Sequence, residues 1–400
     1  MSKSWQMLLL LSLAELLAMT VWFSASAVGL ALKIEWGFQD GQIAWLVMAV
    51  QLGFVAGTLL ISITNLADIL NTRQVFAGSA ALSAIANAIF PLTSGHFAAA
   101  VFLRILTGVF LAGVYPPGMK IMAGWFRSRR GLAIGALVGA LTIGSAAPHL
   151  VGAILREQWR LTILASSAFS MLSALIVLTL VKDGPYDVPA QSFNFKYMFE
   201  IFKYRPTRLA YFGYFGHMWE LYAMWTWVPI FLFSTIEANA VTHSFHPGLG
   251  AFLVIAAGAV GCVGYGLWAD NIGRSKSTIT AMTFSGLCCF VVGFLQQMSP
   301  VWLLIVCIFW GITVVADSAQ FSAAATELCD PQYMGTALTL QTSIGFLITM
   351  ISIRLVPLLT DMGGWGLAFS TLGVGPVSGI IAMSRLYKMP DAIKMANGNR

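Results

Sequence analysis

The sequence predicts an all-α integral membrane protein with twelve transmembrane helices, and three observations support that prediction. Of the 400 residues, 58% are hydrophobic and only 10% are charged, whereas a soluble domain carries roughly 25% charged residues. The apolar residues come in runs of about 20 or more, which is the length of a helix that crosses a bilayer. The charged residues lie mainly between these runs. Because barrel strands are shorter and alternate in polarity, the runs predict helices.

The twelve predicted spans fall into two sets of six. In order they are 6–32, 43–63, 73–94, 97–122, 131–153, 160–181, 209–234, 248–269, 277–297, 300–325, 334–357 and 365–386. The longest break between them contains three prolines and eight charged residues. We therefore predict an N-terminal six-helix bundle over 1–181, a cytoplasmic central loop over 182–208 and a C-terminal six-helix bundle over 209–400. The loop segment "FKYMFEIFK" pairs Lys196 with Glu200 at i,i+4, which suits a short helix at the membrane surface.

The distribution of basic residues predicts the orientation. Most of the 22 lysine and arginine residues fall in loops on one side if the N-terminus is cytoplasmic. Positive loops face the cytoplasm, so both termini are expected there, in a plasma membrane such as the bacterial inner membrane. Lys3, the apolar run after it and "SASA" at 24–27 imitate a cleavable secretory signal. Glu15 within that run, and its continuation to Leu32, favour an uncleaved first helix.

Composition and motifs exclude several classes of function. The basic residues are dispersed over short loops, so no nucleic-acid partner is expected. The five cysteines show no C-x-x-C spacing, and His243 and His246 alone make a poor metal site, so no metal or cofactor is expected. No run matches the phosphate-binding G-x-x-x-x-G-K-[ST] pattern. Segments outside the membrane are too short to hold a catalytic domain, so the chain is not expected to be an enzyme.

The stretch "GLWADNIGRSKS", residues 266–277, places unusual charge between two apolar runs. Gly266 allows close approach of neighbouring helices, and Gly273 permits a tight turn. Asp270 can cap a helix or pair with a basic residue across the loop, while Arg274 supplies such a partner. The pattern therefore predicts a gate that holds helix ends together. The alternative is that these charges only set the orientation.

The first half carries a partial copy of this loop in "TNLADILNTRQV", residues 64–75. Asp68 and Arg73 remain, but both glycines are replaced. Asp68 and Asp270 occupy the same loop of each half, and the fifth helix of each half opens on a glycine. This repeat predicts two bundles related by a pseudo-two-fold axis, with the substrate site at their interface.

Together these features resemble the major facilitator superfamily. Gly266, Asp270, Gly273 and Arg274 match its G-x-x-x-D-x-x-G-R-[RK] loop signature, with Lys276 close behind, and Arg104 followed by Gly108 matches the signature of its fourth helix. The resemblance covers essentially the whole chain. It implies transport by alternating access, with the first, fourth, seventh and tenth helices lining a central cavity.

A looser resemblance points to one branch. "GVYPPGMKIMAGWFRSRRGLAIGALVGALTIGSAAPHL" is similar to the anion-porter side of the superfamily, the cyanate permeases and nitrate/nitrite porters. The arginines of the second and eighth helices and the Gly-Asn-rich signatures of nitrate porters are missing, so nitrate itself is not expected. The signature of drug–proton antiporters is not intact, because "SAA" separates Gly144 from Pro148.

Ionisable residues inside spans are functional candidates, because burying them in lipid is costly. Arg104 could bind an anionic substrate bidentately, or it could neutralise Glu15 until a proton arrives. The structural alternative is a permanent salt bridge between Arg104 and Glu15. His217 and Glu220 share a face of the seventh helix at i,i+3, which suits proton coupling; the alternative is a satisfied hydrogen bond between them.

Further candidates lie on the helices expected to line the cavity. Asp317 and Gln320 stand together on the tenth helix, where a gate role competes with a binding role. The candidate substrate-binding residues are Arg104, Trp22, Gln51, Tyr115, Trp219, Trp225 and Gln320. The candidate proton-coupling residues are Glu15, His217, Glu220 and Asp317. The candidate gate residues are Asp68, Arg73, Gly266, Asp270, Gly273 and Arg274.

Three functions follow, in order of preference. The first is a monomeric, proton-coupled secondary transporter of a small organic anion, with the solute, protons and the lipid bilayer as its only partners. The second is a proton-driven exporter of amphipathic or cationic compounds. The third is a membrane sensor or scaffold that keeps a transporter fold without transport.

Overall fold

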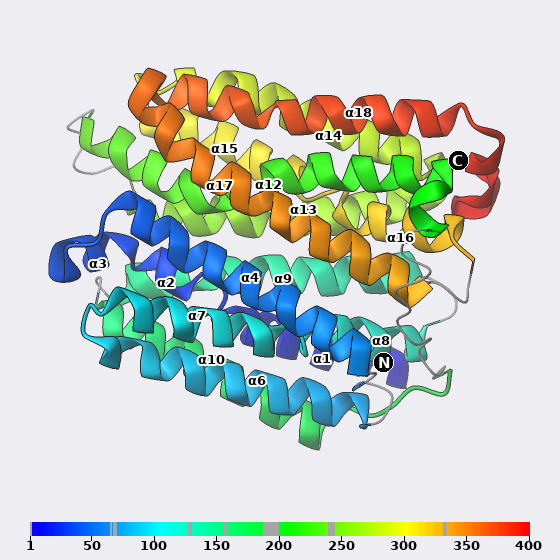
Figure 1. Ribbon diagram of the computed structural model, residues 1–400, viewed down its shortest axis with the longest axis horizontal. Helices are drawn as coiled ribbons and strands as arrows, with labels where there is room; N and C mark the ends of the chain where they lie inside the picture. Colours follow the sequence, from blue (N-terminus) through cyan, green and yellow to red (C-terminus); the bar gives the residue numbers. More distant parts are fainter. Residues whose placement is uncertain are drawn as a thin grey trace. The chain divides into compact units, whose positions relative to one another are not determined.

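The computed structural model describes residues 2–64, 66, 70–126, 130–155, 158–186, 200–238, 245–330 and 334–400. Within these ranges every regular element is a helix, which confirms the predicted all-α class (Figure 1). Contacts divide the chain into two units. The first comprises Met1–Pro189 and His243–Ala256, and the second comprises Ala190–Thr242 and Ala257–Arg400. The predicted loop boundaries at 182 and 208 remain a prediction, because much of that loop lies outside the described residues.

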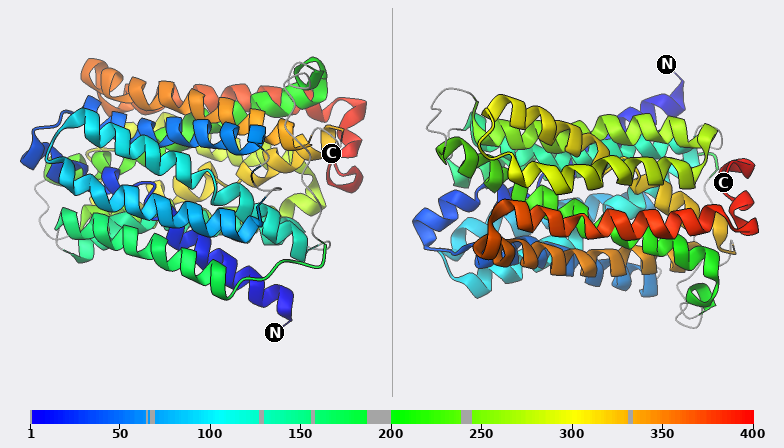
Figure 2. Two further views of the ribbon diagram at one scale, coloured as in Figure 1. Left: turned by 60° about the horizontal axis from the view of Figure 1, so that its bottom comes forward. Right: turned by 90° about the horizontal axis from the view of Figure 1, so that it is seen from above.

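The first unit contains four long helices and several broken ones. They are α1 Lys3–Met19, α2 Ser24–Ala27, α3 Gly29–Trp36, α4 Asp40–Thr64, α6 Thr72–Ile89, η1 Phe90–Thr93, α7 Phe97–Leu111, α8 Tyr115–Trp125, α9 Arg130–Ile154 and α10 Trp159–Thr179. Helix α6 packs along α10, and α4 packs along α7 (Figures 1 and 2).

The second unit follows the same pattern of long and broken helices. They are α12 Arg205–Ala238, α13 Pro247–Ile272, which begins in the first unit, α14 Arg274–Val291, η2 Val292–Phe294, α15 Pro300–Val314, α16 Ser318–Leu328, α17 Met334–Leu372, α18 Val374–Tyr387, η4 Pro390–Lys394 and η5 Ala396–Gly398. Helix α12 packs against both α17 and α18, and α14 packs along α18.

The described helices are those of a multi-pass membrane protein. Nine helical stretches within the described ranges are long and apolar enough to cross a bilayer, and the last of them, Met334–Tyr387, covers two predicted spans. These two spans are separated where Gly363 and Gly364 leave the helical conformation, Gly364 at a φ of 73°. The predicted first and seventh spans are not among the nine. Helix α1 has only 17 residues before its break, and α12 is rich in tryptophan, tyrosine, His and Glu. The count of twelve remains a prediction.

Three predicted spans are interrupted by short non-helical breaks: residues 20–23 between α1 and α2, 112–114 between α7 and α8, and 315–317 between α15 and α16. Pro116 and Pro117 explain the second break, since proline is tolerated in the first turn of a helix, where its missing N–H is not needed. Each break leaves backbone carbonyls without the usual i+4 donor. In the interior of a membrane protein these groups need side-chain partners.

Small residues let the helices of the first unit approach closely. A Cβ placed at Gly108 of α7 would meet the backbone of Val50 and would lie 2.8 Å from the Phe54 nitrogen on α4. A Cβ at Gly53 of α4 would in turn meet the Ile105 carbonyl of α7. The two helices therefore touch backbone to backbone at these glycines, as in other small-residue membrane interfaces.

This contact predicts the effect of one methyl group. Gly108→Ala should force α4 and α7 apart and cost about 1–3 kcal/mol, the usual cost of overpacking a core. Thermal unfolding of the purified protein in detergent measures it. Gly78→Ala on α6 is the matched control, because a Cβ there would meet nothing within 4 Å. Equal unfolding midpoints for the two variants would contradict the close approach.

A second prediction concerns an ion pair outside the spans. Glu35 of α3 accepts hydrogen bonds from Arg160 and from the Trp159 indole, the latter at 2.6 Å. Arg160, and then Trp159, lower the pKa of the Glu35 carboxyl from its ordinary 4.5. Because the folded pKa is the lower one, the pair stabilises the fold above pH 4.5 and is lost as the pH falls through the folded pKa.

The expected result is a pH-dependent difference between wild type and Glu35→Gln. Their unfolding midpoints should differ by a constant amount at neutral pH, and the difference should vanish in acid. A difference that grows as the pH falls would contradict the assignment.

Candidate functional site

The first unit buries the guanidinium of Arg104 against the break at 20–23. Its Nη1 donates to the Val21 carbonyl at 3.1 Å and to Asn87 Oδ1 at 2.8 Å. Its Nη2 donates to the carbonyls of Val21 at 3.1 Å and Trp22 at 2.5 Å. Ser24 Oγ accepts a longer bond from Nη1 at 3.3 Å. Arg104, only 1% exposed, thus replaces the helical donors that the break removes.

Asn87 of α6 holds this arrangement to the rest of the bundle. Its Oδ1 accepts from Arg104 and from Ser24 Oγ at 2.8 Å, while its Nδ2 donates to the Ile163 carbonyl at 3.1 Å and to Ser167 Oγ at 2.9 Å. One amide therefore connects the break, α6, α7 and α10. Sequence reasoning missed Asn87, since an uncharged asparagine in an apolar run gives no signal of its own.

Glu15 does not belong to this network. No carboxylate lies within ion-pair distance of Arg104 among the described residues, so the hypothesised Glu15–Arg104 salt bridge is not formed there. Glu15 is fully buried, and neither carboxyl oxygen has a hydrogen-bond partner in the described part of the chain. The carboxyl lies against Gly118 of α8, where a Cβ would be 2.9 Å from Oε2. Arg104 instead binds neutral backbone oxygens because the break presents them in a cluster.

The other predicted residues of the first unit lie on three different elements. Trp22 is in the break and its ring packs 5.0 Å from that of Phe54 on α4. Gln51 lies one turn before Phe54 on α4 and is fully buried. Tyr115 opens α8 after the break at 112–114 and is partly exposed. Trp22 is the one of these three whose backbone Arg104 binds directly.

In the second unit, His217 of α12 meets Asp317 at the break between α15 and α16. His217 Nδ1 and Asp317 Oδ1 lie 2.8 Å apart, with side chains only 1% and 2% exposed. The rings of Tyr214 and Phe321 flank the imidazole, at 5.9 and 5.8 Å. His217 Nε2 has no hydrogen-bond partner among the described residues. The predicted alternative, a hydrogen bond between His217 and Glu220, is therefore not what His217 makes.

Glu220 has a separate set of partners on neighbouring helices. Its Oε1 accepts from the Trp310 indole at 2.6 Å and from Cys289 Sγ at 3.2 Å, and its Oε2 accepts from Ser285 Oγ at 3.0 Å. Sequence reasoning missed all three donors, because they lie 65 to 90 positions away along the chain. Glu220 and His217 share a helix, but Glu220 ties it to α14 and α15, whereas His217 meets the break before α16.

The predicted aromatic residues of α12 are held by the bundle itself. Trp219 donates from its indole to the Thr371 carbonyl at 3.2 Å. Trp225 is 1% exposed and packs on Tyr222, with ring centres 5.5 Å apart. Both contacts are compatible with packing alone, so a substrate-binding role for Trp219 and Trp225 remains a proposal.

The loop motif forms an ionic cluster around Arg274. Its Nη1 donates to Asp270 Oδ1 at 2.9 Å and to Gln320 Oε1 at 2.8 Å, and its Nη2 donates to Glu327 Oε1 at 3.1 Å. Gln320 was predicted as a substrate-binding residue. Its side-chain oxygen accepts from the buried guanidinium of Arg274, and a role in substrate binding remains a prediction. Glu327 was missed, since nothing in its local sequence distinguishes it from a surface acid.

The two predicted glycines of this loop differ in their surroundings and backbone conformation. Gly273 caps α14 at a φ of 95°, which only glycine adopts readily. Gly266 is buried within α13.

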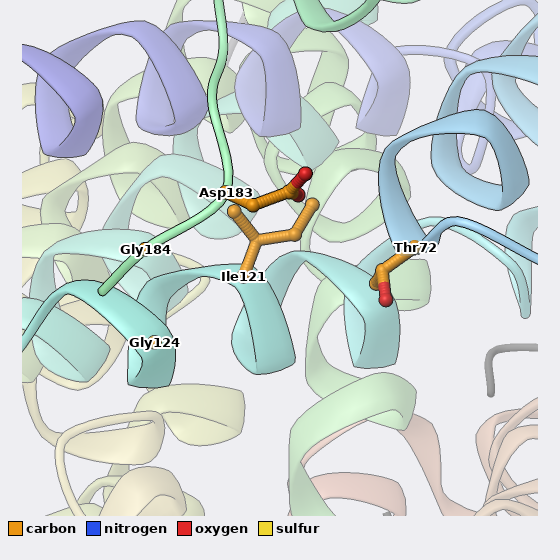
Figure 3. Close-up of a pocket in the computed structure, with 5 residues that line it drawn as sticks. All are labelled: Thr72, Ile121, Gly124, Asp183 and Gly184. Carbon is orange, nitrogen blue, oxygen red and sulfur yellow. The ribbon is translucent and has the colours of Figure 1, made fainter. Parts of the chain in front are cut away.

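The partial copy in the first half makes a simpler contact. Asp68 lies outside the described residues. Arg73 forms an ion pair with Asp183, with Nη2 and Oδ2 3.0 Å apart, and donates from Nη1 to the Val181 carbonyl at 3.0 Å. A small hollow beside this pair is lined by Thr72, Ile121, Gly124, Asp183 and Gly184 (Figure 3). Asp183 was not predicted, because it lies in the central loop, 110 positions from Arg73.

No metal centre is found where the structure can be described. Those residues contain no group of three or more His, Cys, Asp or Glu side chains that could hold an ion.

The Arg104 network predicts a stability effect. Asn87→Ala should cost about 1–3 kcal/mol, because a buried guanidinium loses a side-chain acceptor and two α10 groups lose a donor. Thermal unfolding in detergent measures the cost. Thr179→Ala is the control, since its exposed hydroxyl bonds only within its own helix. A midpoint unchanged by Asn87→Ala would show that the network does not hold the break.

Comparisons with known proteins identify the family. Residues 11–353 match the family model of the Major Facilitator Superfamily. An uncharacterized MFS-type transporter of Mycobacterium tuberculosis (strain CDC 1551 / Oshkosh) is 25% identical over 334 residues, 79% of this chain and 70% of the relative.

Two solved structures share the fold. A D-xylose–proton symporter superposes with a TM-score of 0.76 at 13% identity, covering 98% of this chain and 99% of its own. The nucleoside transporter NupG superposes with a TM-score of 0.72 at 16% identity, covering 96% and 100%. Because the family model spans most of its length, the chain belongs to the Major Facilitator Superfamily of membrane transporters and is not an enzyme.

Proposed function

We propose that this chain is a proton-coupled secondary transporter of a small organic anion. It would work by alternating access in the bacterial inner membrane, as a monomer with both termini in the cytoplasm. One observation carries the proposal: the first unit buries a carboxyl and a guanidinium that are not paired with each other. Similarity to solved structures speaks only for the fold, so the substrate is argued from these residues.

Glu15 is the best-supported proton carrier. A buried carboxyl without donors is costly in its charged form, so it favours the neutral, proton-bound form until water reaches it. Glu220 differs, since three hydrogen-bond donors on neighbouring helices already hold its carboxyl group. We therefore propose that Glu220 is a structural anchor and that Glu15 carries the coupled proton, with His217 and Asp317 as further candidates for proton coupling.

Arg104 supports an anionic substrate through its charge. Every described partner of its guanidinium is a neutral oxygen, so a positive charge remains in the bundle interior. Both terminal nitrogens of Arg104 already donate hydrogen bonds within the bundle. The proposal therefore does not include the bidentate hydrogen bonding of Arg104 to substrate that the sequence suggested. Arg104 would instead attract the anion and fix Trp22, while Trp22, Gln51 and Tyr115 would contact it.

One observation favours a second candidate function. An unpaired Glu15 could also exchange its proton for a cationic compound, with the Trp22–Phe54 pair as an aromatic wall. That is the mechanism expected of an exporter of amphipathic or cationic compounds. Resistance of cells to a panel of toxic cations distinguishes the two: no change on expression or deletion argues against export. Solute-driven flux in proteoliposomes would eliminate a non-transporting sensor.

The substrate class can be tested on the purified protein. A thermal-shift screen of carboxylates, inorganic anions and cationic drugs should find stabilisation by carboxylates in wild type. Arg104→Ala should remove that stabilisation and abolish uptake into proteoliposomes, while the protein still inserts in the membrane. Normal uptake by Arg104→Ala would overturn the anion assignment.

The proton carrier can be tested with an isosteric change. Glu15→Gln imitates the protonated acid, so uptake driven by a pH gradient should fall at least tenfold, about 1.4 kcal/mol of coupling. Exchange of substrate across the membrane without net proton movement should persist. Glu220→Gln is the comparison, and we expect it to lower thermal stability because an amide nitrogen would face hydrogen-bond donors. Full pH-driven uptake by Glu15→Gln would exclude Glu15 as the carrier.

A further inference from the structure

The segment after α18 is folded onto the second unit. It forms two short turns, η4 and η5. Ala392, Met395 and Ala396 are buried, so the segment has an interior face of its own. In Figures 1 and 2 its red ribbon turns back beside the end of the bundle that carries α16. None of these contacts is needed to end a transmembrane helix.

A first anchor joins the segment to the residues just before α12. The Tyr204 hydroxyl donates to Asp391 Oδ1 at 2.6 Å, and Lys394 Nζ donates to the Tyr204 hydroxyl at 2.9 Å. Lys394 and Asp391 also form an ion pair at 3.0 Å. The hydrogen bond from Tyr204, and then that from Lys394, lower the pKa of the Asp391 carboxyl. This anchor thus holds η4 at the start of α12.

A second anchor joins the segment to the loop motif. The Ala396 backbone N–H donates to Glu327 Oε2 at 3.0 Å, and the other oxygen of Glu327 accepts from Arg274. The Asn399 side chain donates to the Asp270 carbonyl at 3.1 Å. A Cβ added at Gly273 would lie 2.8 Å from the Asn399 carbonyl carbon. The segment therefore contacts two of the residues that bind Arg274, Glu327 and Asp270, and also Gly273 just before Arg274.

The backbone of the segment is held in an unfavourable conformation. Ala396 and Asn397 have φ values of 46° and 54°, in the left-handed region that costs energy for residues with a Cβ. Two such residues in succession persist only where the surroundings determine them. Here the surroundings are the burial of the Ala396 methyl group and the hydrogen bond from the Ala396 N–H to Glu327.

We propose that residues 390–399 form an intramolecular latch on the loop motif. The latch positions Glu327 and, through Glu327, Arg274. The guanidinium of Arg274 then donates its hydrogen bonds to acceptors within the second unit. When the latch is released, Glu327 and residues 268–278 around the loop motif become more mobile together. Arg274 can then donate hydrogen bonds to other acceptors. The inference goes beyond the proposed function, because it does not depend on which solute is carried.

A native cysteine reports on the latch. Cys329 lies two residues after Glu327 and is half-buried, whereas the other four cysteines, Cys262, Cys288, Cys289 and Cys307, are buried. Alkylation of the full chain with N-ethylmaleimide, followed by mass spectrometry, therefore measures opening at the end of α16. Hydrogen exchange of peptides spanning 268–278 and 390–399 measures the loop and the latch directly.

Release should change both measurements together. Deletion of 390–400 should speed alkylation of Cys329 and exchange of 268–278 at least tenfold. Asn399→Ala removes a side chain of the second anchor, and Asp391→Asn removes the negative charge that pairs with Lys394 in the first. Both variants should give smaller increases in the same direction. They keep the test valid if the deletion does not fold. Asp361→Asn, which removes an exposed carboxyl of α17 elsewhere in the second unit, should leave both rates unchanged.

Two outcomes would overturn the proposal. One is wild-type rates at Cys329 and at 268–278 in both the deletion and the point variants. The other is exchange of the 390–399 amides in wild type as fast as in an unstructured peptide.

Discussion

The first unit depends on one interaction, the burial of Arg104 against a helix that has lost its own hydrogen bonds. Residues 20–23 cannot continue α1, and their carbonyls would be stranded inside the bundle without a donor. The guanidinium supplies several donors in a rigid plane, which a lysine could not do. The cost of burying its charge is offset by four hydrogen bonds to three neutral oxygens, and Asn87 connects the guanidinium to α6. The Glu15 carboxyl, buried in the same unit, does not share these contacts.

The second unit also contains a broken helix, and acidic side chains lie at or near its break. The break at 315–317 interrupts the tenth span. Helix α12 contacts this span at the break, through His217 at Asp317, and before it in α15, through Glu220 at Trp310. Both contacts join the same two helical segments within one bundle. In a transporter that works by rocking two bundles, contacts inside a bundle have to survive the cycle. The ionic cluster of Arg274 and the proposed latch lie within the same unit.

The relation between sequence and site differs from residue to residue. Arg104, Glu15 and Glu220 could be identified from the sequence, because charged residues are rare in apolar runs and costly to bury. Their partners could not. Asn87, Ser285 and Trp310 are ordinary residues of apolar helices, and Asp183 and Glu327 resemble surface acids. Each acquires its role only because folding brings it to a charge more than 15 positions away. The two structural alternatives, a Glu15–Arg104 salt bridge and a His217–Glu220 hydrogen bond, are not formed among the described residues. Local spacing does not say which neighbouring helix offers the better acceptor.

The sequence by itself determined the membrane class, the helical architecture, the membership of a transporter superfamily and the breaks at proline and glycine. These follow from local chemistry: hydropathy over 20 residues, the missing N–H of proline, and the φ that only glycine tolerates at Gly273 and Gly364. Only the tertiary structure decided which charges are paired, that Gln320 belongs to Arg274, and that the segment after α18 folds back onto the loop motif. Those outcomes depend on competition among donors and acceptors from distant helices, and that competition exists only once the helices are packed.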